Sequence, residues 1–286
     1  MFGFINIYKP VGMTSHDVIG NLRRITKIKQ IGHTGTLDPF AEGVLPIAIG
    51  KATRLIEYLS DDKAYIGRFC FGKSTDTYDI EGNIIKEYKD RVSEKDVIKY
   101  LPKGNIEQFP PIYSAKKING KKMYELARAG IKAEDIEIKP SKVHIYESKI
   151  IEFNEKEQWA DIYIKCSKGT YIRSIANDLG KSLNNGCFLS KLKRVQSGLF
   201  DINQTCMLED LKSVSDVERN MLNPTDYLYQ IKRELNEKEY NRISHGMCLY
   251  SNGAKDGEFV LLIKNNNLVA VAQVEGEILK PKKVMI

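Results

Sequence analysis

The sequence predicts an α+β fold with two parts: a large mixed α/β domain over about residues 1–225 and a small β-rich domain over 226–286. In the first part, segments with strand-like alternation of apolar residues are interspersed with capped amphipathic helices. We expect a mostly antiparallel mixed sheet flanked by helices, and the paired strands expected at 142–153 and 159–167 fit it. After Asn223-Pro224 the helical pattern weakens and strands predominate. A chain of 286 residues is long enough for this division.

The first elements lead up to a shaped loop. Residues 4–8 are expected to form a strand, and Thr14 or Ser15 can cap the helix that follows. Residues 44–49 are a continuous apolar run, typical of a buried strand. The helix is expected to bury one face made of Val18, Ile19, Leu22 and Ile25.

The loop before that strand, residues 32–39, has the sequence Gly-His-Thr-Gly-Thr-Leu-Asp-Pro. Glycine permits unusual backbone angles, and Pro39 keeps Asp38 out of the helical region, so regular structure is excluded. A lone Asp-Pro pair is usually only a turn. A turn does not need the additional polar side chains of His33, Thr34 and Thr36, however. A polar loop on a buried strand is suited to holding a reactive carboxylate, so Asp38 is the candidate.

The middle of the chain alternates helices, strands and polar turns. Residues 53–59 and 93–101 are expected to be helices, with Ser93 capping the second. Residues 64–72 are expected to form a strand, and 74–82 a polar turn. The strand is expected to place Tyr65, Gly67, Phe69 and Phe71 on one face. Taken alone, Tyr65 is best interpreted as an ordinary strand aromatic.

A basic segment follows at residues 109–124. Pro110 and Pro111 exclude regular structure there. Lysines can contact phosphates and aromatic rings can stack on bases, so this composition suits RNA, although a solvated lysine-rich loop explains it equally well. The lysines concerned are Lys116, Lys117, Lys121 and Lys122, interleaved with Tyr113 and Tyr124.

Further strands and one more helix complete the pattern. Residues 142–153 and 159–167 are expected to pair across a turn. A glycine turn at Gly169 then leads into a helix capped by Thr170 and closed by Gly180. In the C-terminal part, residues 259–263 and 268–272 predict a hairpin, and this part of the sequence carries no functional motif.

Composition sets limits on function. The net charge of +7 and pI of about 8.9 permit a polyanionic partner without requiring one. The five cysteines have no Cys-x-x-Cys spacing, so neither a zinc site nor a disulfide framework is expected. Scattered cysteines of this kind fit a reducing compartment, so we expect a cytoplasmic location. We find no signal peptide, no apolar run long enough to span a membrane and no glycine-rich nucleotide motif. We therefore expect no cofactor and no metal.

Four segments together resemble the TruB family of tRNA pseudouridine synthases. The first is the Lys-Pro motif at residues 9–10, and the second is the loop 32–39 with the Ala-Glu-Gly-Val-Leu-Pro that follows it. The third is the polar turn 74–82, and the fourth is Cys-Ser-Lys-Gly-Thr-Tyr-Ile-Arg-Ser at 166–174. The resemblance covers about residues 4–200 and implies the pseudouridine synthase fold.

The resemblance also implies roles for individual residues. Asp38 corresponds to the catalytic nucleophile, and Arg173 is the candidate cation beside it. Tyr65 and Tyr171 would stack on the flipped base, Leu192 would form an apolar wall, and His33 would fill the space that the base leaves. The segment at about 103–140 would be an RNA-binding insertion, and residues 226–286 would be a PUA-like RNA-binding domain.

The implied function is isomerisation of the T-loop uridine of tRNA to pseudouridine, by base flipping, aspartate-dependent cleavage of the glycosidic bond and rejoining through C5. The partner would be the T-arm stem-loop, and we expect a monomer with no obligatory protein partner. One alternative is a guide-RNA-dependent enzyme of ribosomal RNA, disfavoured because the Lys-Pro motif begins at residue 9. Another is a non-catalytic tRNA-folding chaperone. It is disfavoured by the presence together of Asp38, Tyr65, Tyr171 and Arg173.

Overall fold

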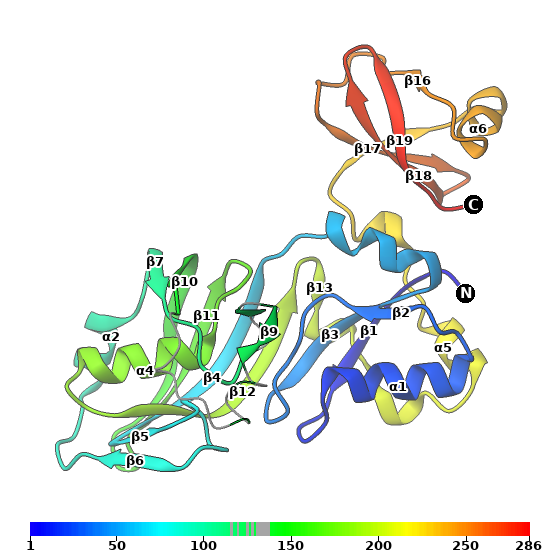
Figure 1. Ribbon diagram of the computed structural model, residues 1–286. Coiled ribbons are helices and arrows are strands. Elements are labelled where there is room, and N and C mark those ends of the chain that lie inside the picture. The colour runs from blue at the N-terminus through cyan, green and yellow to red at the C-terminus, as the bar shows by residue number, and fades with distance from the viewer. Residues whose placement is uncertain (115–116, 119, 124–125, 127–128, 130–137) are drawn as a thin grey trace.

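The computed structural model spans residues 1–286 and describes all of them except 115–116, 119, 124–125, 127–128 and 130–137. Its main body is a ten-stranded sheet (Figure 1). Neighbouring strands along it are antiparallel except for the pairs β1–β14 and β3–β12. The predicted mixed, mostly antiparallel sheet is therefore confirmed. Its order is β14 (Cys206–Met207), β1 (Gly3–Lys9), β3 (Glu42–Ile49), β12 (Cys187–Ser197), β4 (Lys63–Phe71), β11 (Trp159–Cys166), β10 (Ser141–Asn154) and β7 (Gly104–Gln108), with β2 (Ile31–His33) on β3 and β13 (Phe200–Asp201) on β12.

Alternation along β1 and β3 divides the interior into two cores. Ile5 and Leu45 point to one side of the sheet and Phe4 and Val44 to the other, because successive side chains of a strand alternate. The larger core lies under the helices and holds most of the buried aliphatic residues. The helices that contribute to it are α1 (Ser15–Thr26), α2 (Glu94–Tyr100), α4 (Ile172–Ser182) and α5 (Val214–Arg219).

Local sequence signals locate several elements correctly. The Thr14 hydroxyl accepts from the Asp17 N–H, and the Asp17 carboxylate accepts from the Thr14 N–H, which forms a capping box at the start of α1. Strands β10 and β11 pair as the expected hairpin. The segment expected to be a helix at 53–59 is a 3₁₀ helix, η1 (Gly50–Tyr58), which begins three residues earlier and ends one residue earlier than expected.

Two local expectations about α4 are wrong. The N-cap is Tyr171, without a side-chain cap, and the Thr170 hydroxyl instead donates to the Ser167 carbonyl within the preceding turn. Gly180 lies inside the helix rather than closing it. A Cβ at position 180 would lie 2.5 Å from the Cys187 nitrogen. The glycine is therefore needed for close packing of helix against strand, a role that its position in the sequence does not distinguish from helix termination.

Short elements connect the main strands. Residues 73–87 form a small hairpin in place of a simple turn, and the elements at 117–122 form another. The remaining short elements are β5 (Lys73–Thr75), β6 (Ile84–Glu87), β8 (Lys117–Ile118), β9 (Lys121–Lys122), η3 (Ile202–Gln204), η4 (Leu208–Asp210) and η5 (Pro224–Asp226).

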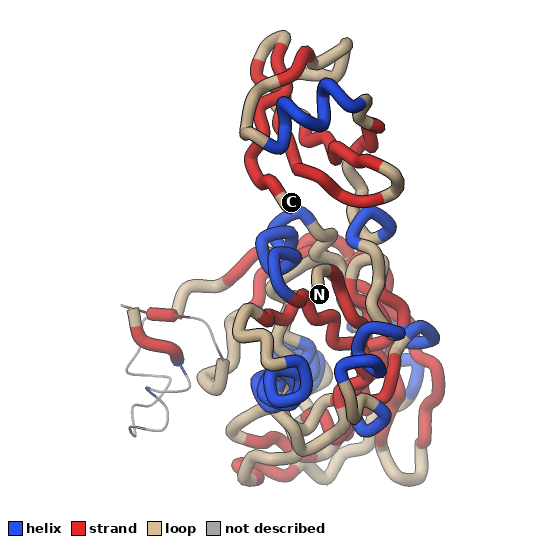
Figure 2. The backbone as a smooth tube through the Cα atoms, turned by 90° about the vertical axis from the view of Figure 1, so that its right-hand side faces the viewer, coloured by secondary structure: helices blue, strands red, loops and turns tan. Residues whose placement is uncertain are grey.

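The C-terminal part forms a separate five-stranded sheet, which contains the predicted hairpin as β17 and β18. Figure 2 shows it standing beyond the end of the main body, with both chain termini near the junction. Its strands run in the order β15 (Ile231–Glu234), β17 (Phe259–Lys264), β18 (Asn267–Glu275), β19 (Ile278–Val284) and β16 (Leu249–Tyr250), with α6 (Glu237–Ser244) beside them.

The two sheets share the second, smaller core. Residues of β1 and β3 pack in it with residues of β17 and β18. The Phe200 ring stacks on Tyr227 at 4.3 Å and meets Phe4 edge-on at 5.6 Å. Lys51 of η1 also donates to the carbonyl of Ile286. The C-terminal sheet is therefore packed against the main body rather than joined to it only by a linker.

Candidate active site

Asp38 lies in the loop between β2 and β3, and the main chain around it is fixed by several hydrogen bonds. The Ser15 hydroxyl, at the start of α1, accepts from the Leu37 N–H at 2.9 Å and donates to the Leu37 carbonyl at 3.3 Å. The Gly12 N–H donates to the Pro39 carbonyl at 2.8 Å. The loop that holds Asp38 is therefore bonded on both sides of that residue.

Two fully buried cations also donate to carbonyls of this region. Lys9 donates through Nζ to the Pro10, Met13 and Pro39 carbonyls, and burial lowers its pKa to about 8. Arg194 donates to the Val44 carbonyl at 2.7 Å and to carbonyls within residues 35–36. The sequence did not identify Arg194, because its targets are backbone atoms about 150 residues away. Through Lys9 the Lys-Pro motif therefore packs against the loop that holds Asp38.

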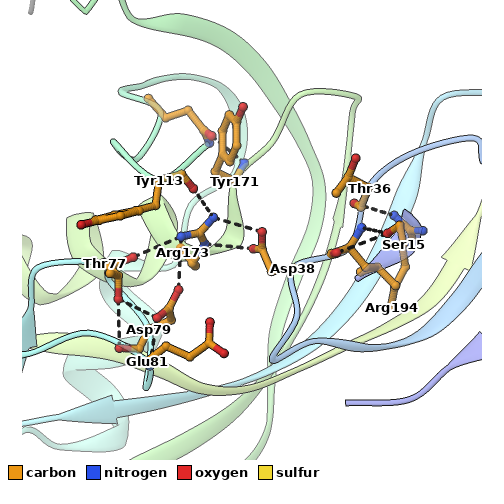
Figure 3. A network of polar contacts seen from close by, with 12 residues as sticks. Ser15, Thr36, Asp38, Thr77, Asp79, Glu81, Tyr113, Tyr171, Arg173 and Arg194 are labelled. Atoms are coloured by element: carbon orange, nitrogen blue, oxygen red, sulfur yellow. Dashed lines mark hydrogen bonds and ion pairs between the residues drawn. The ribbon is translucent and has the colours of Figure 1, made fainter. Parts of the chain in front are cut away.

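Arg173, in the first turn of α4, faces the Asp38 carboxylate (Figure 3). Its Nε lies 3.0 Å from Oδ2 of Asp38, and its Nη2 donates to Oδ1 at 3.2 Å. This two-point contact fixes the plane of the carboxylate as well as its position. The structure therefore brings together the two residues that the sequence proposed as nucleophile and cation.

Asp79 is a third member of this network and was not singled out from the sequence. It lies in the turn between β5 and β6, and its Oδ2 is 3.2 Å from Nη1 of Arg173. Its other oxygen accepts from the Thr77 hydroxyl at 2.6 Å and from the Glu81 N–H at 3.1 Å. The signal that could have found it is the position of Asp79 inside the polar turn 74–82, already recognised as a family-like motif.

Arg173 also reaches the segment that leads into the basic insertion. Its Nη2 donates to the Tyr113 carbonyl at 2.9 Å. Next to it, the Ser174 hydroxyl donates to the Phe109 carbonyl at 2.7 Å, and the Tyr171 N–H donates to the Gln108 side chain at 2.6 Å. The first turn of α4 thus connects the Asp38 loop to the root of the insertion.

The Asp38 carboxyl is surrounded by protein yet open at one edge, since 36% of its side-chain surface is exposed. Burial raises its pKa above the usual range, the Arg173 guanidinium opposes this, and the charge of Asp79 adds to it. Arg173, expected from the sequence as the cation beside Asp38, thus lowers the pKa of Asp38, but burial outweighs its contribution. The exposed edge leaves the carboxylate accessible to a substrate.

Tyr65 and Leu192 lie on adjacent strands, and Tyr171 lies at the start of α4. Tyr65 of β4 is opposite Arg194 of β12 and only 7% exposed. Leu192 is opposite Gly67 and 6% exposed. Tyr171 is half-buried and lies beside the Asp38–Arg173 pair in Figure 3. Burial raises the pKa of both tyrosines, so both hydroxyls keep their protons at neutral pH.

His33 is bonded differently from the other predicted site residues. Its ring packs edge-on against His16 of α1, with centroids 5.6 Å apart. Among the described residues its buried Nδ1 has no hydrogen-bond partner. Burial lowers its pKa to about 4, and His16 and Arg194 add to the effect. His33 is therefore neutral at physiological pH, and its proposed part in base flipping stays a prediction.

The predicted RNA-binding lysines cannot be placed. Lys116 lies outside the described residues, and for Lys117, Lys121 and Lys122 the backbone is described but the side chains are not. Over the described part of the chain, no group of three or more His, Cys, Asp or Glu residues has the arrangement of a metal site. Over the same part, no helix is both long and apolar enough to cross a membrane.

Comparison with solved structures shows the fold. The chain in a crystal structure of a Cbf5–Nop10–Gar1 complex aligns over 100% of this chain and 85% of its own length, with a TM-score of 0.75 and 24% identity. A chain in a structure of an H/ACA RNP bound to a substrate RNA containing 2′-deoxyuridine aligns with a TM-score of 0.72 and 22% identity, over 100% of this chain and 85% of its own. At these identities the likeness concerns architecture.

Comparison of sequences shows the family. The model of the family described as "TruB family pseudouridylate synthase (N terminal domain)" matches residues 23–172 of this chain. The tRNA pseudouridine synthase B of Clostridioides difficile is 42% identical, over 94% of this chain and 93% of its own. The protein of that name from Caldanaerobacter subterraneus is 38% identical, over 99% and 98%. These matches include the Asp38 loop and extend beyond it over nearly the whole chain, and the chain therefore belongs to the TruB family of pseudouridylate synthases.

Proposed function

We propose that this chain converts the T-loop uridine of tRNA, at position 55, to pseudouridine, with Asp38 as the catalytic residue. The observation that supports it most directly is the Asp38 carboxylate, held at two points by Arg173 and open at one edge. That arrangement presents one oriented carboxylate to an incoming base. Three relatives that carry the name tRNA pseudouridine synthase B are 42%, 47% and 38% identical to this chain.

The reaction requires no redox change and no group donor. The bond between N1 of uracil and C1′ of ribose breaks, the detached uracil turns, and a bond forms between C5 and C1′. The proton on C5 leaves and N1 gains one, so the product is an isomer of the substrate. The ionised Asp38 acts on the ribose or on the base during cleavage, and Arg173 keeps its orientation throughout.

Base flipping is required because the reacting bond is inaccessible within a stacked loop. Tyr171 is half-buried beside the Asp38–Arg173 pair and can cover one face of the extruded base. Tyr65 and Leu192 supply an apolar wall from the adjacent strands. We assign His33 to the space that the flipped base leaves, as a neutral ring at the end of β2, where the loop that holds Asp38 begins.

RNA binding is assigned to three parts of the chain. Residues 1–225 form the catalytic domain, the segment at about 103–140 inserted in it contacts the T-arm, and residues 226–286 form a PUA-like domain that adds affinity. Arg173 supports the second assignment, because it contacts both Asp38 and the Tyr113 carbonyl at the root of the insertion. We propose that the protein acts as a monomer without a protein partner.

The decisive experiment is incubation of the pure protein with an unmodified tRNA transcript, followed by mapping of pseudouridine. We expect conversion at the T-loop position with no guide RNA, metal or cofactor added. Conversion that appeared only with an added guide RNA would favour the guide-directed alternative. Faster refolding of tRNA with no pseudouridine at any position would favour the chaperone alternative.

A further inference from the structure

Lys63 lies close to the loop that holds Asp38. It is the first residue of β4, and it lies on the same face of that strand as Tyr65 because two positions separate them. Its neighbours across the sheet are Cys166 of β11 and Ser197 of β12. The chain that leaves β11 after Cys166 continues directly into the turn before Tyr171. Lys63 thus lies between β12, which carries Leu192, and the end of β11, from which the chain continues to Tyr171.

The stem of Lys63 lies against the Asp38 loop at Gly35. A Cβ built on Gly35 would be 3.2 Å from Cε of Lys63 and 3.7 Å from Nη1 of Arg194. Since Gly35 has no side chain, two cations can approach the same stretch of loop from different strands. The loop conformation and the position of Lys63 therefore depend on each other.

The positive charge at this place is not neutralised by the protein. Lys63 Nζ donates to the Asp61 carbonyl at 2.9 Å, and the Asp61 carboxylate is paired with Lys168 at 3.1 Å. Within the described residues, neither Lys63 nor Arg194 forms an ion pair with a carboxylate. Burial lowers the pKa of Lys63, and the charge of Arg194 adds to this. An anion bound here would stabilise the charged form of Lys63 and offset its repulsion from Arg194.

We propose that Lys63, with Arg194 behind it, binds a phosphate of the RNA backbone next to the flipped uridine. This inference rests on the proposed function, since the anion is part of the RNA substrate. A lysine ammonium suits the role because it is a compact charge that needs no fixed plane of approach. Contact with the phosphate fixes the ribose next to Asp38. Because the stem of Lys63 packs on Gly35 of the same loop, the phosphate site and the Asp38 carboxylate keep a fixed distance from each other.

The test compares Lys63→Met with Lys168→Met. Methionine keeps an unbranched stem over Gly35 and removes the charge, while Lys168 is an exposed neighbouring lysine whose removal costs the same net charge. Affinity for a T-arm stem-loop is measured over a range of salt concentrations. Both variants are made in the Asp38→Asn background, so that the RNA is not converted during the measurement.

We expect Lys63→Met to weaken binding about tenfold, because one charged contact is lost. The slope of log K against log salt should fall by about 0.7–0.9, the change expected when one phosphate contact is lost. Lys168→Met should leave both nearly unchanged. An unchanged slope for Lys63→Met would overturn the proposal, and so would equal losses in the two variants, which would indicate a general field effect. Lys63→Arg should recover most of the slope.

A second variant covers the case in which Lys63→Met fails to fold. Lys63→Gln removes the same charge and keeps an unbranched polar side chain over Gly35, where a built Cβ would lie 3.2 Å from Cε of Lys63. We expect weaker binding with an unchanged fold, and unaltered binding would overturn the proposal. Pseudouridine formation by the wild-type protein is measured separately. If the variants bind RNA as the wild type does but the wild-type protein forms pseudouridine, the phosphate site is wrong and the proposed function is still supported.

Discussion

Arg173 contacts both carboxylate oxygens of Asp38, at 3.0 Å to Oδ2 and 3.2 Å to Oδ1. The same guanidinium lies 3.2 Å from Asp79, so one cation is shared between two carboxylates. A guanidinium can do this because its donors form a rigid planar fork. The position of Asp38 is therefore set by α4 and by the 74–82 turn, as well as by its own loop.

Replacing Arg173 should affect both turnover and stability. Arg173→Ala leaves two carboxylates without their cation, and removal of one partner from a buried pair costs about 3–5 kcal/mol of unfolding free energy. Arg173→Lys keeps the charge but loses the two-point contact, so kcat should fall at least tenfold with a smaller loss of stability. Thermal melting and single-turnover kinetics measure the two effects. Wild-type kcat in a folded Arg173→Lys variant would contradict the orienting role.

Asp38→Asn should abolish product formation and leave affinity for tRNA within a few fold. The amide is nearly isosteric with the carboxylate, so the change removes the charge and nucleophile without removing much contact. Filter binding and pseudouridine mapping on the same preparation measure the two quantities. If the variant formed pseudouridine at nearly the wild-type rate, Asp38 would not be the catalytic residue.

The pH dependence of kcat should report the ionisation of Asp38. Burial raises its pKa above the value of about 3.9 for a free aspartate, so kcat should rise with pH through an inflection above that value and then level off. The charge of Asp79 contributes to the raised pKa, so Asp79→Asn should move the inflection to lower pH. The same change should lower the plateau about tenfold or more, because Arg173 loses one of its two anions. An inflection moved to higher pH would mean that this account of the network is wrong.

His33 should make the folded state less stable in mild acid. Its pKa is about 4 in the folded protein and about 6.5 when exposed, so between these values the unfolded chain binds more protons. Stability attributable to His33 is therefore complete above about pH 6.5 and is lost as the pH falls towards 4. His33→Gln should flatten this part of the curve of melting temperature against pH. A curve identical to the wild type would contradict the buried neutral state.

Phe200→Ala should destabilise the protein through the core that the two sheets share. The ring is 2% exposed and stacks on Tyr227, and loss of a buried phenylalanine costs about 3–5 kcal/mol. Leu199→Ala, at an exposed neighbouring position, is the matched control and should cost far less. Calorimetry measures the difference. Equal effects of the two changes would show that the shared core contributes little.

Sequence analysis was most successful where the controlling interactions are local. The Thr14 cap, the alternation in β4 and the β10–β11 hairpin depend on neighbours in the chain. Arg194 and Asp79 were missed because their contacts cross between distant segments. The only local signal was the position of Asp79 in the family-like turn 74–82, and Arg194 had none. The family-like motifs did locate Asp38 and Arg173, and the structure places those two in contact.

The smaller core has a consequence for synthesis, because Phe4 and Met285 belong to the same buried cluster. The two residues lie 281 positions apart in the sequence. The helix-covered core draws on residues 5–217 and can assemble earlier, while the sheet face around Phe4 stays uncovered until the strands of the C-terminal sheet have been synthesised. A nascent chain that stalled before β17 would therefore expose the aromatic surface of β1 and β13.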